Sequence, residues 1–265
     1  MKLSGQVVLK PAINPHWSLL PGLSGNSWRT SEGDDLVQRL PPQPPIPFVN
    51  RQREYRILQK LGSAPFSTFA KKFHAGVLSV AWVEGEPLPP SAFIPENTEL
   101  LAVCKSLHRH PLFGYRLPVL PLLQRYWQVC QQRNATWLKI LQRLRHQGEP
   151  RPLRLVPLHM DLHPGNVIQT AQGLALIDWE YSADGDIALE LTTLCLQDPS
   201  RTNAWIAAYA DAFNLNPDSL RLQCRRWKPW LQLLQASWCQ LRAEQTQQLS
   251  MQQLAAEQWR QLSLY

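Results

Sequence analysis

The sequence predicts an α+β protein with two lobes, a small mixed one followed by a larger, mainly helical one. Short β-prone segments and a proline-rich connector fill the first part of the chain, whereas apolar residues at helical spacing dominate beyond residue 97. Between the two lies EGEPLPP (84–90), whose glycine and prolines favour a hinge. We therefore expect a small lobe over residues 1–84 and a helical lobe over 85–265, which is enough chain to bury a large core.

The small lobe is expected to combine strands with one helix. DDLVQRL (34–40) resembles a short strand, and PPQPPIPF (41–48) is a stiff connector because proline continues neither a helix nor a central strand. NRQREYRILQKL (50–61) places apolar residues at helical spacing and carries Glu54. VLSVAWV (77–83) then reads as a buried strand that runs into the hinge.

Amphipathic helices are expected through most of the second lobe. The segment 97–110 has an apolar face behind Asn97 or Thr98 as a cap, and 120–148 holds one or two helices that end at Gly148. Helical patterns continue over 187–197, 202–213, 225–245 and 251–264.

Composition narrows the class of protein. A net charge of +7 would suit a nucleic acid or a small anion such as a nucleotide, but the basic residues alternate with apolar positions, as on solvated helix faces. Five cysteines without a C-x-x-C pair indicate neither a disulfide framework nor a zinc site. No apolar run is long enough to cross a bilayer, and the first residues lack the apolar core of a signal peptide. We expect a cytoplasmic protein without a membrane or nucleic-acid partner.

The most informative stretch is LHMDLHPGNVIQTAQGLALIDWE (158–180). Its runs VIQ and LALI, separated by TAQG, read as a hairpin that returns the chain to its starting end. Asp178 should therefore lie beside Asn166, and an amide oxygen with a carboxylate forms a site suited to Mg²⁺. Asp161, on the loop before the hairpin, is placed to face a substrate hydroxyl, the arrangement needed for phosphoryl transfer from ATP.

Taken one at a time, these residues have a simpler explanation, because Asp or Asn beside Gly or Pro commonly shapes a turn. The ordered pattern H-x-D-x-x-x-x-N, followed by a hairpin and I-D, favours a functional set in Asp161, Asn166 and Asp178. His159 is expected to brace the loop from inside rather than to react.

HMDLHPGN and LIDWE resemble the catalytic and metal-binding loops of the aminoglycoside phosphotransferase and choline kinase family, relatives of the protein kinases. The resemblance implies a protein-kinase-like fold, Asp161 as the catalytic carboxylate, and Asn166 and Asp178 as ligands of Mg²⁺. Further segments are similar to the bacterial members that phosphorylate thiamine: 113–127, 149–166, 173–191 and 225–231. This closer resemblance, which covers roughly 97–265, implies ATP-dependent conversion of thiamine to thiamine monophosphate and ADP.

The nucleotide side departs from the family pattern. GLSGNSW (22–28) is not a G-x-G-x-x-G loop, although Ser24, Gly25 and Asn26 would let backbone N–H groups approach phosphates, and a plain surface turn explains the segment equally well. Where the family has a strand lysine, this chain offers Arg39, with Glu54 as its expected ion-pair partner or, alternatively, as a solvated helix residue.

The acceptor side should be acidic and aromatic, because thiamine carries a cationic ring. Glu180 and Asp184 follow the metal-binding Asp178 closely and are the expected substrate contacts, although Asp184 beside Gly185 would also shape a turn. The candidates for a stacking wall are Trp179, Trp230 and Trp238.

Three other functions remain open at this point. A kinase for choline or an aminoglycoside would also use an acidic pocket, and the irregular glycine loop leaves room for a nucleotide-binding module without catalysis. A basic nucleic-acid binder would show strongly salt-dependent binding to random oligonucleotides.

Overall fold

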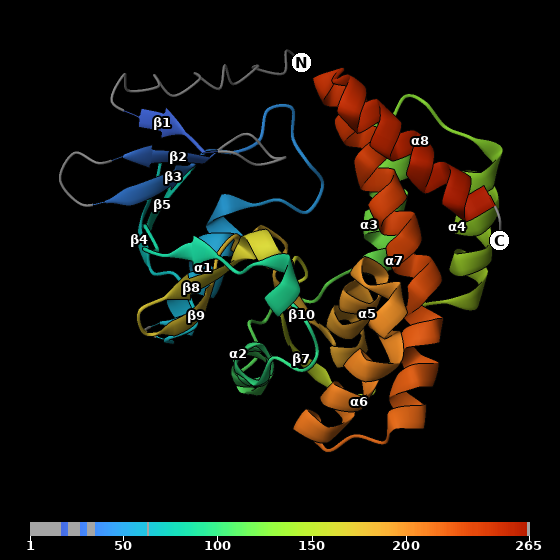
Figure 1. Cartoon of the computed structure of the whole chain (residues 1–265). Helices are drawn as coiled ribbons and strands as arrows, with labels where there is room; N and C mark the ends of the chain where they lie inside the picture. The colour runs from blue at the N-terminus through green and yellow to red at the C-terminus, as the bar shows by residue number, and fades with distance from the viewer. Residues whose placement is uncertain (1–16, 21–26, 31–34, 63, 264–265) are drawn as a thin grey trace, which may run out of the picture.

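A computed structural model describes residues 17–20, 27–30, 35–62 and 64–263 (Figure 1). Its N-terminal part is an antiparallel sheet with one helix against it, which agrees with the expected combination of strands and one helix. The strand order is β1-β2-β3-β5-β4. The elements are β1 (Trp17–Leu19), β2 (Ser27–Thr30), β3 (Leu36–Arg39), α1 (Arg51–Leu61), β4 (Ala70–His74) and β5 (Val77–Ala81).

Helix α1 forms where the sequence predicts it. The side chain of Asn50 caps its first turn by accepting from the N–H of Arg53, and Gly62 ends it with a positive φ of 58°. Ile57, Leu58 and Leu61 bury one face of the helix in the core, where α1 packs against β4 and β5. This packing places the residues of its first turn near the end of β3.

Two small sheets lie between the N-terminal part and the helices. In one, β6 pairs with β8 and β8 with β9, which is the predicted hairpin; in the other, β7 pairs with β10. The strands are β6 (Glu86–Pro87), β7 (Leu155–Leu158), β8 (Val167–Thr170), β9 (Gly173–Leu176) and β10 (Ala183–Asp186), with short 3₁₀ turns η1 (Pro90–Ala92), η2 (Pro164–Asn166) and η3 (Trp179–Tyr181).

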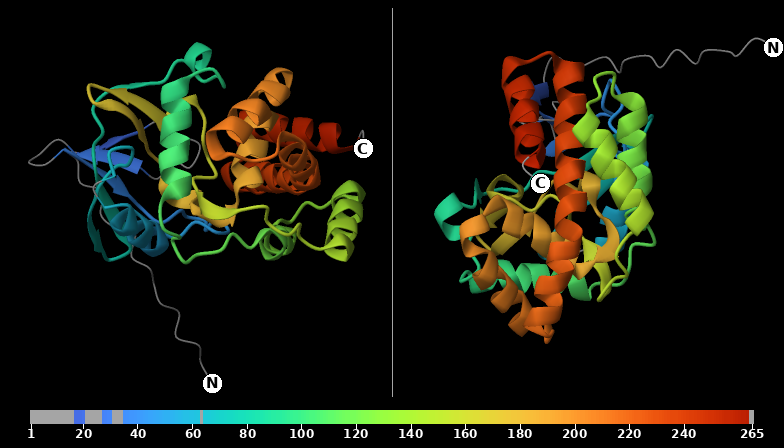
Figure 2. Two further views of the ribbon diagram at one scale, coloured as in Figure 1. Left: turned by 90° about the horizontal axis from the view of Figure 1, so that it is seen from below. Right: turned by 90° about the vertical axis from the view of Figure 1, so that its right-hand side faces the viewer.

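Helices make up most of the C-terminal part, with the long α7 packed against α8, α5 and α3 (Figures 1 and 2). Helix α7 begins earlier than the predicted 225–245, because Asn216 caps it and Pro217 occupies its first turn. The helices are α2 (Thr98–Arg109), α3 (Val119–Val129), α4 (Ala135–Gln147), α5 (Ile187–Gln197), α6 (Thr202–Phe213), α7 (Pro217–Thr246) and α8 (Leu249–Ser263), with the 3₁₀ turn η4 (Pro199–Arg201).

One continuous hydrophobic core joins the sheet side to the helix side, and Phe66 meets Trp179 where the two parts adjoin. The predicted α+β class, with a mixed N-terminal part and a helical C-terminal part, is confirmed. All five cysteines are free and buried. Within the described ranges, none of the helices combines the length and the apolar character that crossing a bilayer requires.

Candidate active site

The loop between β7 and η2 carries Asp161 and is held rigidly from behind. Glu190 of the buried helix α5 accepts hydrogen bonds from the N–H groups of His159 (2.6 Å) and Met160 (2.8 Å). The left-handed φ of 67° at Met160 turns the chain sharply just before Asp161. The loop conformation therefore depends on a buried carboxylate thirty residues further along the chain.

His159 braces the same loop from inside, as expected. Its Nε2 lies 2.9 Å from the carbonyl oxygen of Ile177, and its Nδ1 accepts from the N–H of Asp161 at 3.3 Å, so the ring is neutral with the proton on Nε2. The ring packs on Trp179 with centroids 4.8 Å apart. Burial lowers the pKa of His159 to about 4, which keeps the ring uncharged at neutral pH.

The side chain of Asn166 is oriented by hydrogen bonds to Asp161. Its Nδ2 donates to the backbone oxygen of Asp161 at 2.9 Å and to the carboxylate Oδ2 at 3.0 Å. This assignment directs the amide oxygen Oδ1 away from Asp161, and no group in the described ranges donates a hydrogen bond to that oxygen. The Asn166 side chain thus presents a free oxygen to a cation.

The hairpin brings Asp178 to Asn166, as predicted. Ile177 donates its N–H to the backbone oxygen of Asn166 at 3.0 Å, and Asp178 follows directly in a left-handed conformation with φ 64°. The Asp178 Oδ1 accepts from Nη2 of Arg39. Burial alone would raise the pKa of Asp178, but the Arg39 guanidinium holds it below its usual value, so the group is an anion.

Asp161 has a different protonation behaviour from Asp178. Partial burial raises its pKa to about 8, with further contributions from the negative charges of Asp178 and Glu180, while the hydrogen bond from Asn166 acts in the opposite direction. A carboxylate with a pKa near neutrality is suited to accepting a proton from a substrate hydroxyl.

Arg39 belongs to a closed ring of alternating charges, here called the charge ring and made of Arg39, Glu54, Arg51 and Glu180. Glu54 lies 3.1 Å from Nε of Arg39 and 2.7 Å from Nη1 of Arg51. Glu180 Oε2 accepts from Nη2 of Arg39 at 2.9 Å and from Nη1 of Arg51 at 2.7 Å. All four side chains are buried.

The expected pairing of Arg39 with Glu54 is therefore present, whereas Arg51 was missed. A signal for it exists in the sequence, because Arg51 stands three residues before Glu54 on one helix face. That spacing alone predicts a surface pair. Only the tertiary structure shows that it is buried and shared with Glu180.

Two expected substrate contacts have other roles. Asp184 is buried and accepts from the N–H groups of Phe113, Gly114 and Tyr115, so its carboxylate is fully used in holding the loop before α3. Glu180 is engaged within the charge ring rather than facing an acceptor. In this structure both carboxylates accept from donors of the protein itself, and their expected contact with the substrate stays a prediction.

The three tryptophans proposed as a stacking wall differ in their burial. Trp179 and Trp230 are buried in the core, with 1% and 2% of their surface exposed, so neither forms the expected stacking wall. Trp238 is half-buried and donates from Nε1 to the hydroxyl of Tyr181 at 2.8 Å. Ser24, Gly25 and Asn26 lie outside the described residues.

The side chains fit a magnesium ion at Asn166 and Asp178. A hard cation prefers oxygen ligands, and these residues supply the amide oxygen and an ionised carboxylate. Elsewhere in the described ranges, no three His, Cys, Asp or Glu side chains gather into a metal site. Two protein ligands are typical of Mg²⁺ that is held jointly with nucleotide phosphates.

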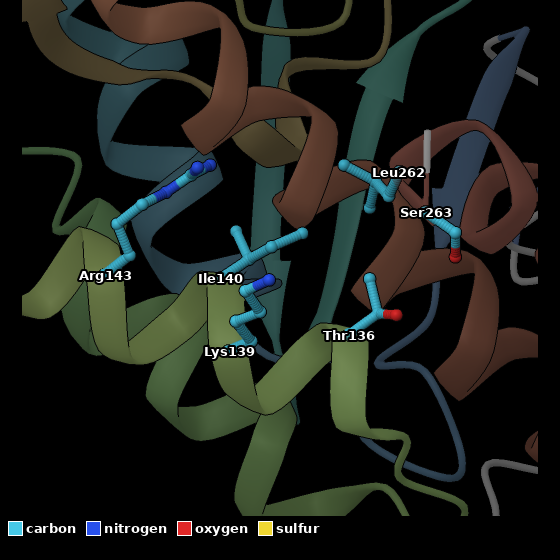
Figure 3. A pocket seen from close by; sticks show the side chains of 6 residues that line it. All are labelled: Thr136, Lys139, Ile140, Arg143, Leu262 and Ser263. Carbon is cyan, nitrogen blue, oxygen red and sulfur yellow. The ribbon is translucent and has the colours of Figure 1, made fainter. Parts of the chain in front are cut away.

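A separate groove lies between α4 and α8 (Figure 3). It contains no member of the catalytic loop or the charge ring and is not part of the site. Its lining residues are Thr136, Lys139, Ile140, Arg143, Leu262 and Ser263.

Comparison with known proteins identifies the family of this chain. Residues 17–225 match the model of the phosphotransferase enzyme family, which spans the sheet, the catalytic loop and the hairpin. The chain belongs to this family. A thiamine kinase of Escherichia coli (strain K12) is 40% identical over 239 residues, covering 89% of this chain and 86% of that protein, and the thiamine kinase of Escherichia coli O157:H7 gives the same figures.

Solved structures agree on the fold. This phosphotransferase superposes on the choline kinase LicA from Streptococcus pneumoniae with a TM-score of 0.72 at 17% identity, covering 94% of this chain and 93% of that one. A choline/ethanolamine kinase family protein from Mesorhizobium loti gives 0.71 at 19% identity, with 97% and 91% covered. At these identities the likeness establishes the kinase-like fold alone.

Proposed function

We propose that this chain catalyses the ATP-dependent phosphorylation of the thiamine hydroxyl, giving thiamine monophosphate and ADP. One observation carries the proposal: a chain that is 40% identical to a thiamine kinase over most of both lengths also brings Asp161, Asn166 and Asp178 together at the ends of one hairpin. Because ATP is the phosphate donor, we place the reaction in the cytoplasm.

Asp161 is the group that orients the acceptor hydroxyl and takes its proton. The carboxylate is part-exposed, with 36% of its side chain accessible, so a substrate can reach it. Its raised pKa of about 8 makes it a stronger base than an ordinary aspartate once it is ionised. The Asn166 amide fixes one carboxylate oxygen and leaves the other to the substrate.

The nucleotide phosphates belong on the side of Asp178 and Arg39. Mg²⁺, held by Asn166 and Asp178, supplies charge neutralisation on the phosphate oxygens when it is bound. The ion pairs and hydrogen bonds of Arg39 use Nε and Nη2, and no group in the described ranges hydrogen-bonds to Nη1. We assign this nitrogen to a phosphate oxygen of ATP.

The cationic ring of the acceptor is assigned to the aromatic pair of Tyr181 and Trp238. Tyr181 is in the 3₁₀ turn that follows Asp178, and its hydroxyl accepts from Nε1 of Trp238 at 2.8 Å. An aromatic face favours a cation. We favour this pair over Glu180 and Asp184 as the acceptor contact, because both carboxylates accept from donors of the protein.

The test is incubation of the purified protein with Mg-ATP and, separately, thiamine, choline and an aminoglycoside, with mass detection of products. We expect thiamine monophosphate and a matching amount of ADP from thiamine alone. Phosphorylation of choline or the aminoglycoside in preference to thiamine would refute the substrate, and absence of any product would refute the activity.

A further inference from the structure

Arg51 joins three parts of the chain at one buried point. Its Nε donates to the backbone oxygen of Leu40, just after β3, at 3.0 Å. Its Nη1 donates to Glu54 on its own helix and to Glu180 beside the Asp178 turn, both at 2.7 Å. Only 2% of the Arg51 side chain is exposed, so these contacts are shielded from water.

Arg51 shares both of its carboxylates with Arg39. In the charge ring each glutamate forms an ion pair with each arginine, and Asp178 is joined to the ring by its ion pair with Arg39. The ring carries two positive and two negative charges, and Asp178 adds one more negative charge. Without Arg51, Arg39 would be the remaining cation of the ring, and it would face the carboxylates of both glutamates and of Asp178.

This arrangement is not explained by stability. The Nη2 group of Arg51 is buried and has no hydrogen-bond partner among the described residues, which costs free energy. Buried ion pairs also contribute little net stability, because desolvation offsets most of their attraction. A cation in this place instead controls how strongly the carboxylates hold Arg39.

We propose that Arg51 is a positioning residue for nucleotide binding: by neutralising Glu54 and Glu180 it keeps Arg39 from being drawn wholly onto them and leaves it directed at the phosphates. The proposal rests on the function proposed above. Arginine is required because one planar guanidinium serves Leu40, Glu54 and Glu180 together, whereas the ammonium group of lysine is a point donor on a flexible stem.

Arg51→Met and Arg51→Lys test the proposal through binding as well as turnover. The binding probe is ADP without Mg²⁺, measured by titration calorimetry, together with KM for ATP and thiamine. We expect Arg51→Met to weaken ADP binding and raise KM for ATP by about tenfold or more, the loss of roughly one charge-assisted interaction, with KM for thiamine within twofold. The ADP affinity of Arg51→Lys should lie between those of the parent and Arg51→Met.

A second change separates positioning from damage to the fold. Glu180→Gln removes the carboxylate that Arg51 neutralises, so Arg51→Met with Glu180→Gln should bind ADP more tightly than Arg51→Met alone. Arg56→Met is the matched control, because Arg56 is an exposed arginine on the same helix. It should bind ADP like the parent.

Three results would overturn the inference. They are an ADP affinity of Arg51→Met within twofold of the parent, an equal rise in KM for ATP and for thiamine in that variant, or an ADP affinity of the double variant no higher than that of Arg51→Met. If Arg51→Met does not fold, the comparison of Arg51→Lys with the parent decides, and unchanged ADP affinity there overturns it. A parent protein that binds ADP but phosphorylates no thiamine would refute the proposed function while the ADP titrations still test Arg51.

Discussion

Replacing Asp184 with asparagine should destabilise the fold and leave acceptor binding intact. In the structure the carboxylate is buried and bound by three backbone N–H groups of the loop before α3. The sequence, by contrast, allows Asp184 to be an acidic contact for a cationic substrate. The substitution keeps the size of the side chain and removes its charge, so it separates the two roles.

The size of the effect follows from the hydrogen bonds. Oδ2 accepts from Gly114 at 2.6 Å and Tyr115 at 3.1 Å, whereas Oδ1 accepts from Phe113 at 2.7 Å. Asparagine has one acceptor oxygen, which can serve the first two donors, and its NH₂ group then faces the N–H of Phe113. One lost charge-assisted bond and one unsatisfied buried donor cost about 2–4 kcal/mol. For a chain of this size the melting temperature should fall by roughly 5–15 °C.

The assay combines thermal unfolding with steady-state kinetics at a temperature where both proteins are folded. We expect the lower melting temperature together with values of KM for thiamine and ATP within twofold of the parent. Asp211→Asn, an exposed aspartate on α6, is the control for the loss of one negative charge and should change neither quantity. An unchanged melting temperature with a raised KM for thiamine would show that the bracing role is wrong.

Three further substitutions test the site and its surroundings. Asp178→Asn should abolish detectable turnover while the protein stays folded, because an anionic ligand of the metal is lost; near-normal turnover at limiting Mg²⁺ would contradict the assignment. Asp161→Asn should slow single-turnover phosphorylation by about 10²–10⁴-fold with little change in calorimetric binding of ATP analogue or thiamine, and a rate within a few-fold of the parent would remove its catalytic role. His108→Asn, whose amide can still donate to Pro157, should remove a pH dependence of stability. Burial lowers the pKa of His108 to about 4, so between about pH 6.5 and 4 the unfolded chain binds more protons at this residue than the folded protein does. The free energy of unfolding therefore decreases as the pH is lowered through that window. The difference in unfolding free energy between variant and parent, measured by urea titration, should shift by about 3 kcal/mol in favour of the variant as the pH is lowered from 7 to 4. A difference that stays the same at both pH values would contradict this prediction.

Features that depend on neighbouring residues could be predicted from the sequence. Helix α1 follows from apolar spacing and a cap at Asn50, and the hairpin follows from two β-prone runs around TAQG. The hairpin then fixes the distance between Asn166 and Asp178, because its two ends must meet. The closeness of Asn166 and Asp178 could be predicted because their spacing in sequence is also a constraint in space, whereas their role as metal ligands stays a prediction.

Roles that depend on distant donors could not be predicted in the same way. Asp184 looks like a free carboxylate until the N–H groups of Phe113, Gly114 and Tyr115, some seventy positions away, are placed against it. Glu180 is similar, since its partners Arg39 and Arg51 come from β3 and α1. A carboxylate oxygen is available to a ligand only where the protein leaves that oxygen without a donor, and that is a property of the tertiary structure.

The acceptor side illustrates why reaction chemistry is easier to predict than substrate. Asp161 and Asn166 act within one loop, so their joint role imposes a spacing that the sequence displays. The aromatic pair joins Tyr181 to Trp238, fifty-seven positions apart, through a hydrogen bond between a 3₁₀ turn and the middle of α7. No spacing rule connects such residues, and a tryptophan in a helix looks the same in sequence whether it is in the core, like Trp230, or half-buried, like Trp238. On the proposed assignment of this pair to the acceptor, changes along α7 alter the choice of acceptor while the phosphoryl-transfer loop stays unchanged.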